Sequence, residues 1–224
     1  MRAVATSSKD PETVRAALFV AAPLIVADYT DGSSALALDW YEELRDAAAV
    51  TETFTPSPLV LVTDDTVAAI VAETTEALRE IQQGIEREVE DALAESVRLL
   101  EGETERMVAD AFRDTVTSNV AADPAAGGWR RFARPEACKF CLMLAARGAV
   151  YTEATARFAA HGATTNGKTT GGTCLCIAGP AFGGKGAWAE ATPMQYVASK
   201  RQRTDRERAA LREYLNVNFP DAPG

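Results

Sequence analysis

Cys138-Lys139-Phe140-Cys141 and Cys174-Leu175-Cys176 hold every cysteine of this 224-residue chain, and these two short stretches decide how its second half folds. Zinc in structural sites takes four ligands at tetrahedral corners, and two close pairs of thiolates supply such a set. Residues 162–173, between the pairs, are rich in Gly and Thr and can fold back. We therefore predict a structural zinc cofactor held by four ligands, Cys138, Cys141, Cys174 and Cys176.

Other interpretations of these residues stay open. His161, the only histidine, stands at the end of a predicted helix over 152–160, so it can replace one thiolate or simply form a hydrogen bond at the helix end. The cysteines can also be buried and reduced, or form disulfides. The sequence shows no secretory signal, and a reducing compartment favours metal over disulfides for paired cysteines.

The first half of the chain has apolar residues at helical spacing. Asp10-Pro11-Glu12 combines an N-cap, a proline at the first helical position and an acidic first turn, so it predicts the start of a helix. We expect Asp31-Gly32-Ser33-Ser34 to form a turn before a second helix over 36–49. Asp64 or Asp65 is the predicted N-cap of a further helix, whose apolar stripe continues either as a hairpin or as a long kinked stalk.

Composition and charge change together after Asp123, where one proline, two alanines and two glycines follow in a run. The predicted fold is mainly α with a small α+β module. We expect an acidic α-helical domain over 1–123, a Cys/His-containing module over 124–190, and a basic C-terminal helix with a loose tail over 191–224. A module this small needs more than its own apolar core, and metal binding would supply part of its folding free energy.

The net charge of −9 hides an asymmetry. Residues 1–123 carry 9 Lys/Arg against 25 Asp/Glu, whereas residues 124–224 carry 14 against 7. Such a chain has two kinds of partner, or touches polyanions at one end only, unless the acidic face serves solubility alone.

A basic stretch near the C-terminus is the candidate for contact with DNA or another polyanion. Phosphate contacts need only positive charge and reach, and this stretch supplies both. The same residues can equally form a solvated helix face or dock on an acidic protein, because aromatic side chains for base stacking are absent from them. The candidate contact residues are Lys200, Arg201, Arg203, Arg206 and Arg208.

Several function classes find little support. The longest apolar run, Ala16 to Ala27, is shorter than a membrane span, so no membrane partner is expected. With one histidine and neither G-x-S-x-G nor H-E-x-x-H, no catalytic constellation is evident, and no small-molecule substrate is expected. The stretch from Gly179 to Gly186 nearly matches a P-loop, but Gly186 stands where magnesium needs Ser or Thr, so we interpret it as a glycine loop.

The module resembles a known phage family. The residues that carry the likeness are Gly128-Trp129-Arg130-Arg131-Phe132, the run from Cys138 to Tyr151 with C-x-F-C and R-G-x-x-Y, then Phe158, His161, Cys174-Leu175-Cys176 and Pro180-Ala181-Phe182. They are similar to the Mu F-like minor head proteins, especially the actinobacteriophage branch often labelled capsid maturation protease. Upstream, the stretch from Trp40 to Arg45 and Asp123 also look like the helical half of that branch.

The resemblance implies a structural minor capsid protein for head morphogenesis, with portal protein, major capsid protein or both as partners. Packaged DNA is a further possible partner. Such a protein would be found in the host cytoplasm during assembly and in the interior of the virion head afterwards. Two alternatives stay open, a capsid maturation protease and a DNA-binding protein packaged in the head, although the residues themselves favour a structural role over an enzyme.

Overall fold

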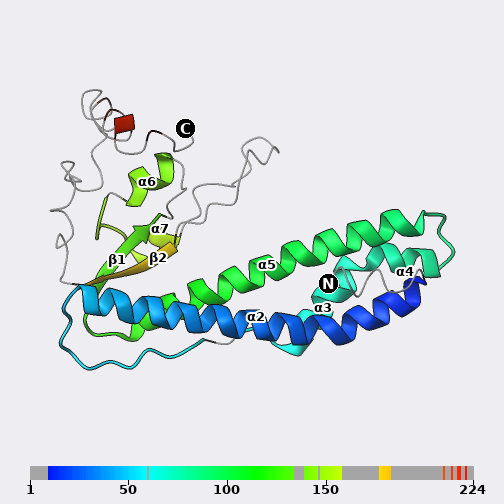
Figure 1. Ribbon diagram of the computed structural model, residues 1–224, viewed down its shortest axis with the longest axis horizontal. Coiled ribbons are helices and arrows are strands. Elements are labelled where there is room, and N and C mark those ends of the chain that lie inside the picture. The colour runs from blue at the N-terminus through cyan, green and yellow to red at the C-terminus, as the bar shows by residue number, and fades with distance from the viewer. Residues whose placement is uncertain are drawn as a thin grey trace. The chain divides into compact units, whose positions relative to one another are not determined.

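The computed structural model describes residues 10–59, 61–133, 139–145, 147–157 and 177–182, with a few single residues nearer the C-terminus. The described chain is mainly helical, as predicted, and has one small sheet (Figure 1). In chain order the elements are α2 (Pro11–Ala47), α3 (Asp64–Thr74), α4 (Glu76–Gln82), α5 (Val89–Ala122), β1 (Ala126–Phe132), α6 (Lys139–Ala145), α7 (Glu153–Arg157) and β2 (Ile177–Phe182).

The predicted start of the first helix is confirmed. Asp10 caps α2 through a hydrogen bond that its carboxylate accepts from the backbone N–H of Thr13, at 2.9 Å. This bond and one from the Thr13 hydroxyl hold the pKa of Asp10 below its ordinary value. Pro11 then occupies the first helical position, where its missing N–H costs nothing.

The predicted turn at residues 31–34 is wrong, because α2 runs through it without a break. Burial explains the difference. Every fourth residue of α2 is buried from one side of the expected turn to the other, and polar side chains inside the helix find backbone partners. Ser33 donates to the carbonyl of Val108 at 2.7 Å, for example, and Thr30 donates to that of Val26 at 2.8 Å. The buried residues are Val14, Leu18, Ala22, Val26, Thr30 and Ser34.

The middle helices also differ in detail from expectation. Thr63, not Asp64 or Asp65, is the N-cap of α3, since its hydroxyl accepts from the N–H of Thr66 at 3.2 Å. Gly84, with a φ of +83°, follows the end of α4 in the left-handed conformation that glycine adopts at little cost. The chain then reverses into α5 (Figure 1), so of the two alternatives the hairpin is the one formed.

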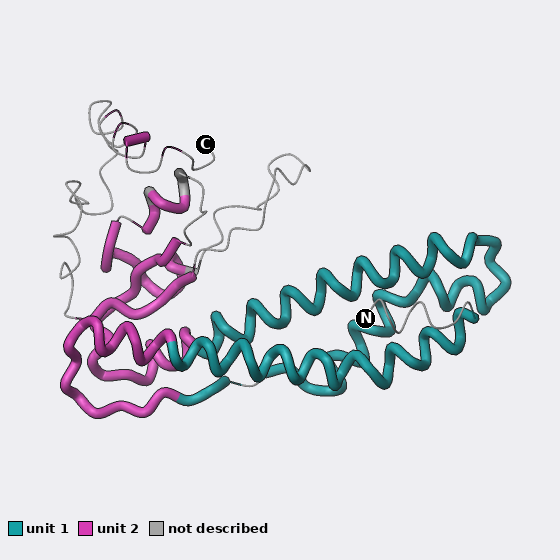
Figure 2. Tube along the Cα trace, viewed as in Figure 1, with its two compact units in different colours: residues 1–39, 57–115 teal, residues 40–56, 116–224 magenta. Residues whose placement is uncertain are grey.

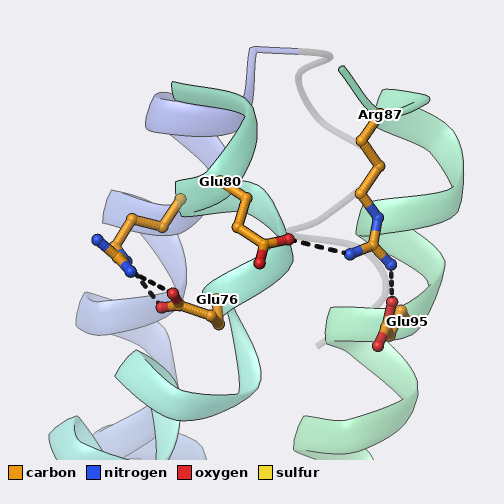
Figure 3. A network of polar contacts seen from close by, with 5 residues as sticks. Glu76, Glu80, Arg87 and Glu95 are labelled. Atoms are coloured by element: carbon orange, nitrogen blue, oxygen red, sulfur yellow. Dashed lines mark hydrogen bonds and ion pairs between the residues drawn. The ribbon is translucent and has the colours of Figure 1, made fainter. Parts of the chain in front are cut away.

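Exposed ion pairs link α4 and α5 on the two sides of this reversal. Arg87 lies in the connection between α4 and α5 and pairs with Glu80 at 3.3 Å and with Glu95 (Figure 3). Glu76 and Arg79 form a separate pair within α4. These groups are a third or more exposed, so solvent screens each pair and its contribution to stability is small.

The chain forms two compact units (Figure 2). The first comprises residues 1–39 and 57–115, and its core joins α2, α3, α4 and α5. The second comprises residues 40–56 and 116–224. Each unit is therefore built from separate stretches of sequence. Core residues of the first unit include Val14, Leu18, Val26, Val67, Val71, Leu78, Leu100 and Met107.

The sheet of the second unit is a two-stranded antiparallel ladder. β1 pairs with β2 so that Trp129 faces Pro180 and Phe132 faces Ile177, with an irregularity between Ala126 and Trp129. Trp129 also forms an isolated bridge to Tyr151, whose backbone N–H donates to the Trp129 carbonyl at 3.3 Å. The ladder thereby brings together segments of the module that lie far apart in sequence.

Candidate functional site: a buried ion pair and the strand ladder of the second unit

A buried ion pair joins the end of α2 to the end of α5. The Arg45 guanidinium donates through Nη1 to Oδ2 of Asp123, and the Asp123 side chain is completely shielded from solvent. Through Nη2, Arg45 also donates to the backbone carbonyl of Glu52, which holds the segment after α2. Because a buried charge is stable only when it is paired and hydrogen-bonded, these contacts define one required arrangement of the three segments.

Two further donors complete the environment of the Asp123 carboxylate. The hydroxyl of Tyr41 donates to Oδ2 at 3.1 Å, and the N–H of Ala125 donates to Oδ1 at 2.9 Å. Burial and then the negative charge of Asp123 raise the pKa of Tyr41 well above its ordinary value. Tyr41 therefore stays protonated, and it acts as a hydrogen-bond donor rather than as an acid or base.

Aromatic rings enclose the ion pair. The Arg45 guanidinium carbon lies 5.4 Å from the ring centre of Phe54 and 5.7 Å from that of Phe182, within the range of cation–π attraction. Phe182 also meets Tyr41 edge to face, with ring centres 5.8 Å apart. Strand β2 is thus attached to the ion pair by its last residue. We call Tyr41, Arg45, Phe54, Asp123 and Phe182 the Arg45 cluster.

The Arg45 cluster has the character of a structural site. Each oxygen of the Asp123 carboxylate accepts a bond, and Arg45 is almost fully buried. A general base must be within reach of a substrate, and Asp123 is not. In the sequence, the stretch from Trp40 to Arg45 and Asp123 stand out through resemblance alone. No local pattern indicates that Tyr41, Arg45 and Asp123 meet.

A glycine at the centre of β2 permits a second aromatic contact. Trp40 and Phe132 meet edge to face with ring centres 4.7 Å apart, and a side chain on Gly179 would come within 2.7 Å of Phe132 and 2.9 Å of Trp40. Gly179 was interpreted from sequence as part of a glycine loop. For residues 179–182 that interpretation is wrong, since they belong to β2 and are buried.

Two arginines of β1 pack against other residues of the module. Arg131 is buried, donates to the carbonyl of Thr155 at 3.1 Å, and has its guanidinium carbon 5.7 Å from the ring centre of Tyr151. Arg130 lies over the ring of Phe132 at 4.4 Å, and burial lowers its pKa. The basic residues that the resemblance highlighted in this strand therefore pack against the module.

Of the predicted metal ligands, only Cys141 lies within the described residues. It is on α6 and is 4% exposed. Cys138, Cys174, Cys176 and His161 lie outside the described residues, as do the predicted anion contacts Lys200, Arg201, Arg203, Arg206 and Arg208. Among the described residues no group of three or more metal-binding side chains is found. Zinc binding and anion contact therefore stay predictions.

One described helix meets the length and composition of a membrane span. It is α2, with a mean hydropathy of 1.3 over its most apolar 18-residue window, of which 28% is buried. Core helices also meet this test, and α2 contributes a regular buried stripe to the first unit. The absence of a membrane partner therefore stays a prediction.

Comparison with known families places the chain among phage-associated proteins. The model of the VG15 protein family matches residues 2–202, which covers most of both units. The chain belongs to the VG15 family of phage-associated viral gene products. Neither the curated proteins nor the solved structures contain a match.

Replacing Arg45 by Met should destabilise the second unit strongly. The substitution leaves the buried Asp123 carboxylate without its counter-charge, so we expect the free energy of unfolding to fall by about 3–5 kcal/mol. Arg87→Met breaks only exposed pairs and should cost less than about 1 kcal/mol. Urea unfolding of both variants, followed by tryptophan fluorescence, measures the difference. Equal losses would show that the Arg45 pair is no more important than a surface pair.

Replacing Gly179 by Ala should also destabilise the second unit, by about 1–3 kcal/mol, because the new methyl group overlaps two aromatic rings. Gly128→Ala is the matched control. It lies in the partner strand, and among the described residues its added carbon would meet only Ala181, at 4.0 Å. Thermal melting of the two variants should show a clear loss for Gly179→Ala and little change for Gly128→Ala. A Gly179→Ala protein as stable as the wild type would rule out the close contact.

Proposed function

We propose that this protein is a minor capsid protein that acts in phage head morphogenesis, in contact with portal protein, major capsid protein or both. One observation carries the proposal beyond family membership: residues through which the chain resembles Mu F-like minor head proteins meet in space. Trp129 faces Pro180 and bridges to Tyr151, and Phe182 packs on the Arg45 cluster. Mutual contact among these residues supports the proposal that the likeness extends to the fold and to the same class of role.

A structural role fits the described chemistry better than proteolysis does. Cys141 is buried, so it is poorly placed to attack a peptide bond. The Asp123 carboxylate is enclosed and fully hydrogen-bonded. Capsid maturation protease and packaged DNA-binding protein remain the alternatives, and the experiments below distinguish them.

We also propose that zinc pins the module through Cys138, Cys141, Cys174 and Cys176, with His161 as a possible substitute for one thiolate. The strand register supports this. Cys176 immediately precedes Ile177, which faces Phe132, and Cys138 follows Phe132 by six residues, a reach of at most about 20 Å. The lengths of these connections therefore allow both pairs to meet beside that end of the ladder. The ion would act as a cross-link that supplies folding free energy.

The zinc proposal predicts that metal content and stability change together. Purified protein should contain about one zinc per chain, and a chelator should lower its melting temperature. Cys141→Ser and Cys174→Ser should each lower zinc content and melting temperature together, because each removes a thiolate ligand. Elemental analysis and thermal melting measure both quantities.

Val150→Thr serves as the control, because it changes an exposed side chain of the module while keeping its shape. It should keep both the zinc and the melting temperature of the wild type. Loss of stability in the Cys variants at unchanged zinc content would mean that the cysteines are ordinary core residues.

The head-assembly proposal is tested by co-expression with the portal and major capsid proteins of the same phage. The protein should sediment with assembled particles and resist added nuclease and protease there, as expected for a component of the interior. The capsid precursor should remain uncut during the incubation. A defined cut would establish the protease instead, and tight duplex binding that weakens steeply with salt would establish the DNA-binding alternative. Failure to sediment with particles would contradict the proposal.

A further inference from the structure

The first unit contains a pocket that the proposed function does not use. It has a volume of about 160 Å³ and lies between α2, α3, α5 and the segment that leads into α3. Its walls are mostly apolar and include Leu59, Val62, Ile70, Met107 and Ala111. A cavity of about 150 Å³ with apolar walls holds a six-carbon ring. The space therefore suits one side chain or a fragment of similar size.

Carboxylates dominate the charge around this pocket. Asp31, Asp110 and Asp114 line it, against a single guanidinium, that of Arg106. Arg106 pairs with Glu103 at 2.6 Å and with Asp110 at 3.4 Å, and Asp110 also pairs with Arg113 at 2.9 Å. With Glu103 and Arg113 included, four carboxylates stand against two guanidinium groups, so the net charge around the pocket is negative and attracts a cation.

The hydroxyl groups in the pocket are already engaged. Thr30 donates to the carbonyl of Val26 at 2.8 Å, and Ser34 accepts from the hydroxyl of Thr115 at 3.3 Å. An occupant of the pocket would therefore be recognised mainly by the apolar walls and the carboxylates. An occupant that fits both the apolar walls and the carboxylates has an aliphatic stem and a cationic head, as arginine and lysine have. Arginine fits better, because a guanidinium group loses its bound water more readily than an ammonium group does.

We propose that this pocket receives an arginine side chain from a basic segment of a partner protein. The acidic character of residues 1–123 supports such a partner, because complementary charge speeds encounter and disfavours acidic competitors. The proposal rests on the first unit alone. It is independent of zinc and of location in the head, so either can fail without the other.

The test uses the full-length protein with isotope-labelled methionine and isoleucine methyl groups, titrated with N-acetyl-arginine-N-methylamide and followed by NMR. The resonances of Met107 and Ile70 should shift, with a Kd on the order of 1 mM for so small a probe. The citrulline analogue has the same shape without the charge, and it should bind about threefold to fivefold more weakly. Equal binding of the two probes, or shifts that spare both Met107 and Ile70, would overturn the proposal.

Two matched variants locate the charge effect. Asp31→Asn removes a carboxylate that lines the pocket, and it should weaken binding of the arginine probe but not of the citrulline analogue. Asp28→Asn removes an exposed carboxylate one turn earlier on α2 that does not line the pocket, so it should leave both affinities unchanged. Equal effects of the two variants would show that the probe is attracted by the acidic surface in general, and this would overturn the proposal. Self-association that Asp31→Asn abolishes would identify a second copy of this chain as the occupant and overturn the partner-protein proposal.

Discussion

The buried carboxylate of Asp123 is the constraint on which the second unit depends. It lies at the junction of α5 and β1, and it takes hydrogen bonds from Tyr41 and Arg45 on α2 as well as from the backbone of Ala125. A single charge thereby fixes where two long helices end relative to the strand that follows. Desolvating an ion pair is costly, so such a pair specifies an arrangement more than it adds stability.

The rest of the module is assembled around that arrangement by packing. Phe182 lies against both Tyr41 and Arg45, so the position of β2 follows from the position of the ion pair. The antiparallel register then fixes β1, and Tyr151 connects β1 to the end of α6 by donating its hydroxyl hydrogen to the carbonyl of Leu144 at 2.6 Å. Each step constrains the next, and this explains how the described part of the module, with its two-stranded sheet, has a defined core.

Signals from neighbouring residues predicted the start of α2 correctly, but not its continuation through Gly32 or the N-cap of α3. Asp10 and Pro11 identified the start of α2, since capping depends only on neighbours in sequence. The turn expected near Gly32 failed because long-range burial of Thr30 and Ser34 outweighed the preference of Gly, Ser and Asp for turns. Capping by Thr63 rather than by the aspartates beside it is within the usual uncertainty of helix ends.

The Arg45 cluster could not be predicted from periodicity or spacing. Arg45 and Asp123 are 78 residues apart, and nothing in either local sequence distinguishes a buried ion pair from an exposed charge on a helix. Family likeness singled out both positions without giving a reason. The structure supplies one, because the stretch from Trp40 to Arg45 provides aromatic and cationic partners for the segments that follow α5. The cysteine pairs, by contrast, stand out in the sequence because chelation would depend on close spacing, and their binding of zinc stays a prediction.

The 78-residue separation of Arg45 and Asp123 also has a consequence for biosynthesis. A bacterial ribosome adds about 5–20 residues per second, so Arg45 waits roughly 4–16 s for its counter-charge to be made, and longer for Phe182. During that interval Trp40, Tyr41 and Phe54 have no strand to cover them. The early segment of the second unit, residues 40–56, is therefore a candidate binding site for chaperones on the nascent chain, and slow codons between residues 116 and 182 would lengthen its exposure.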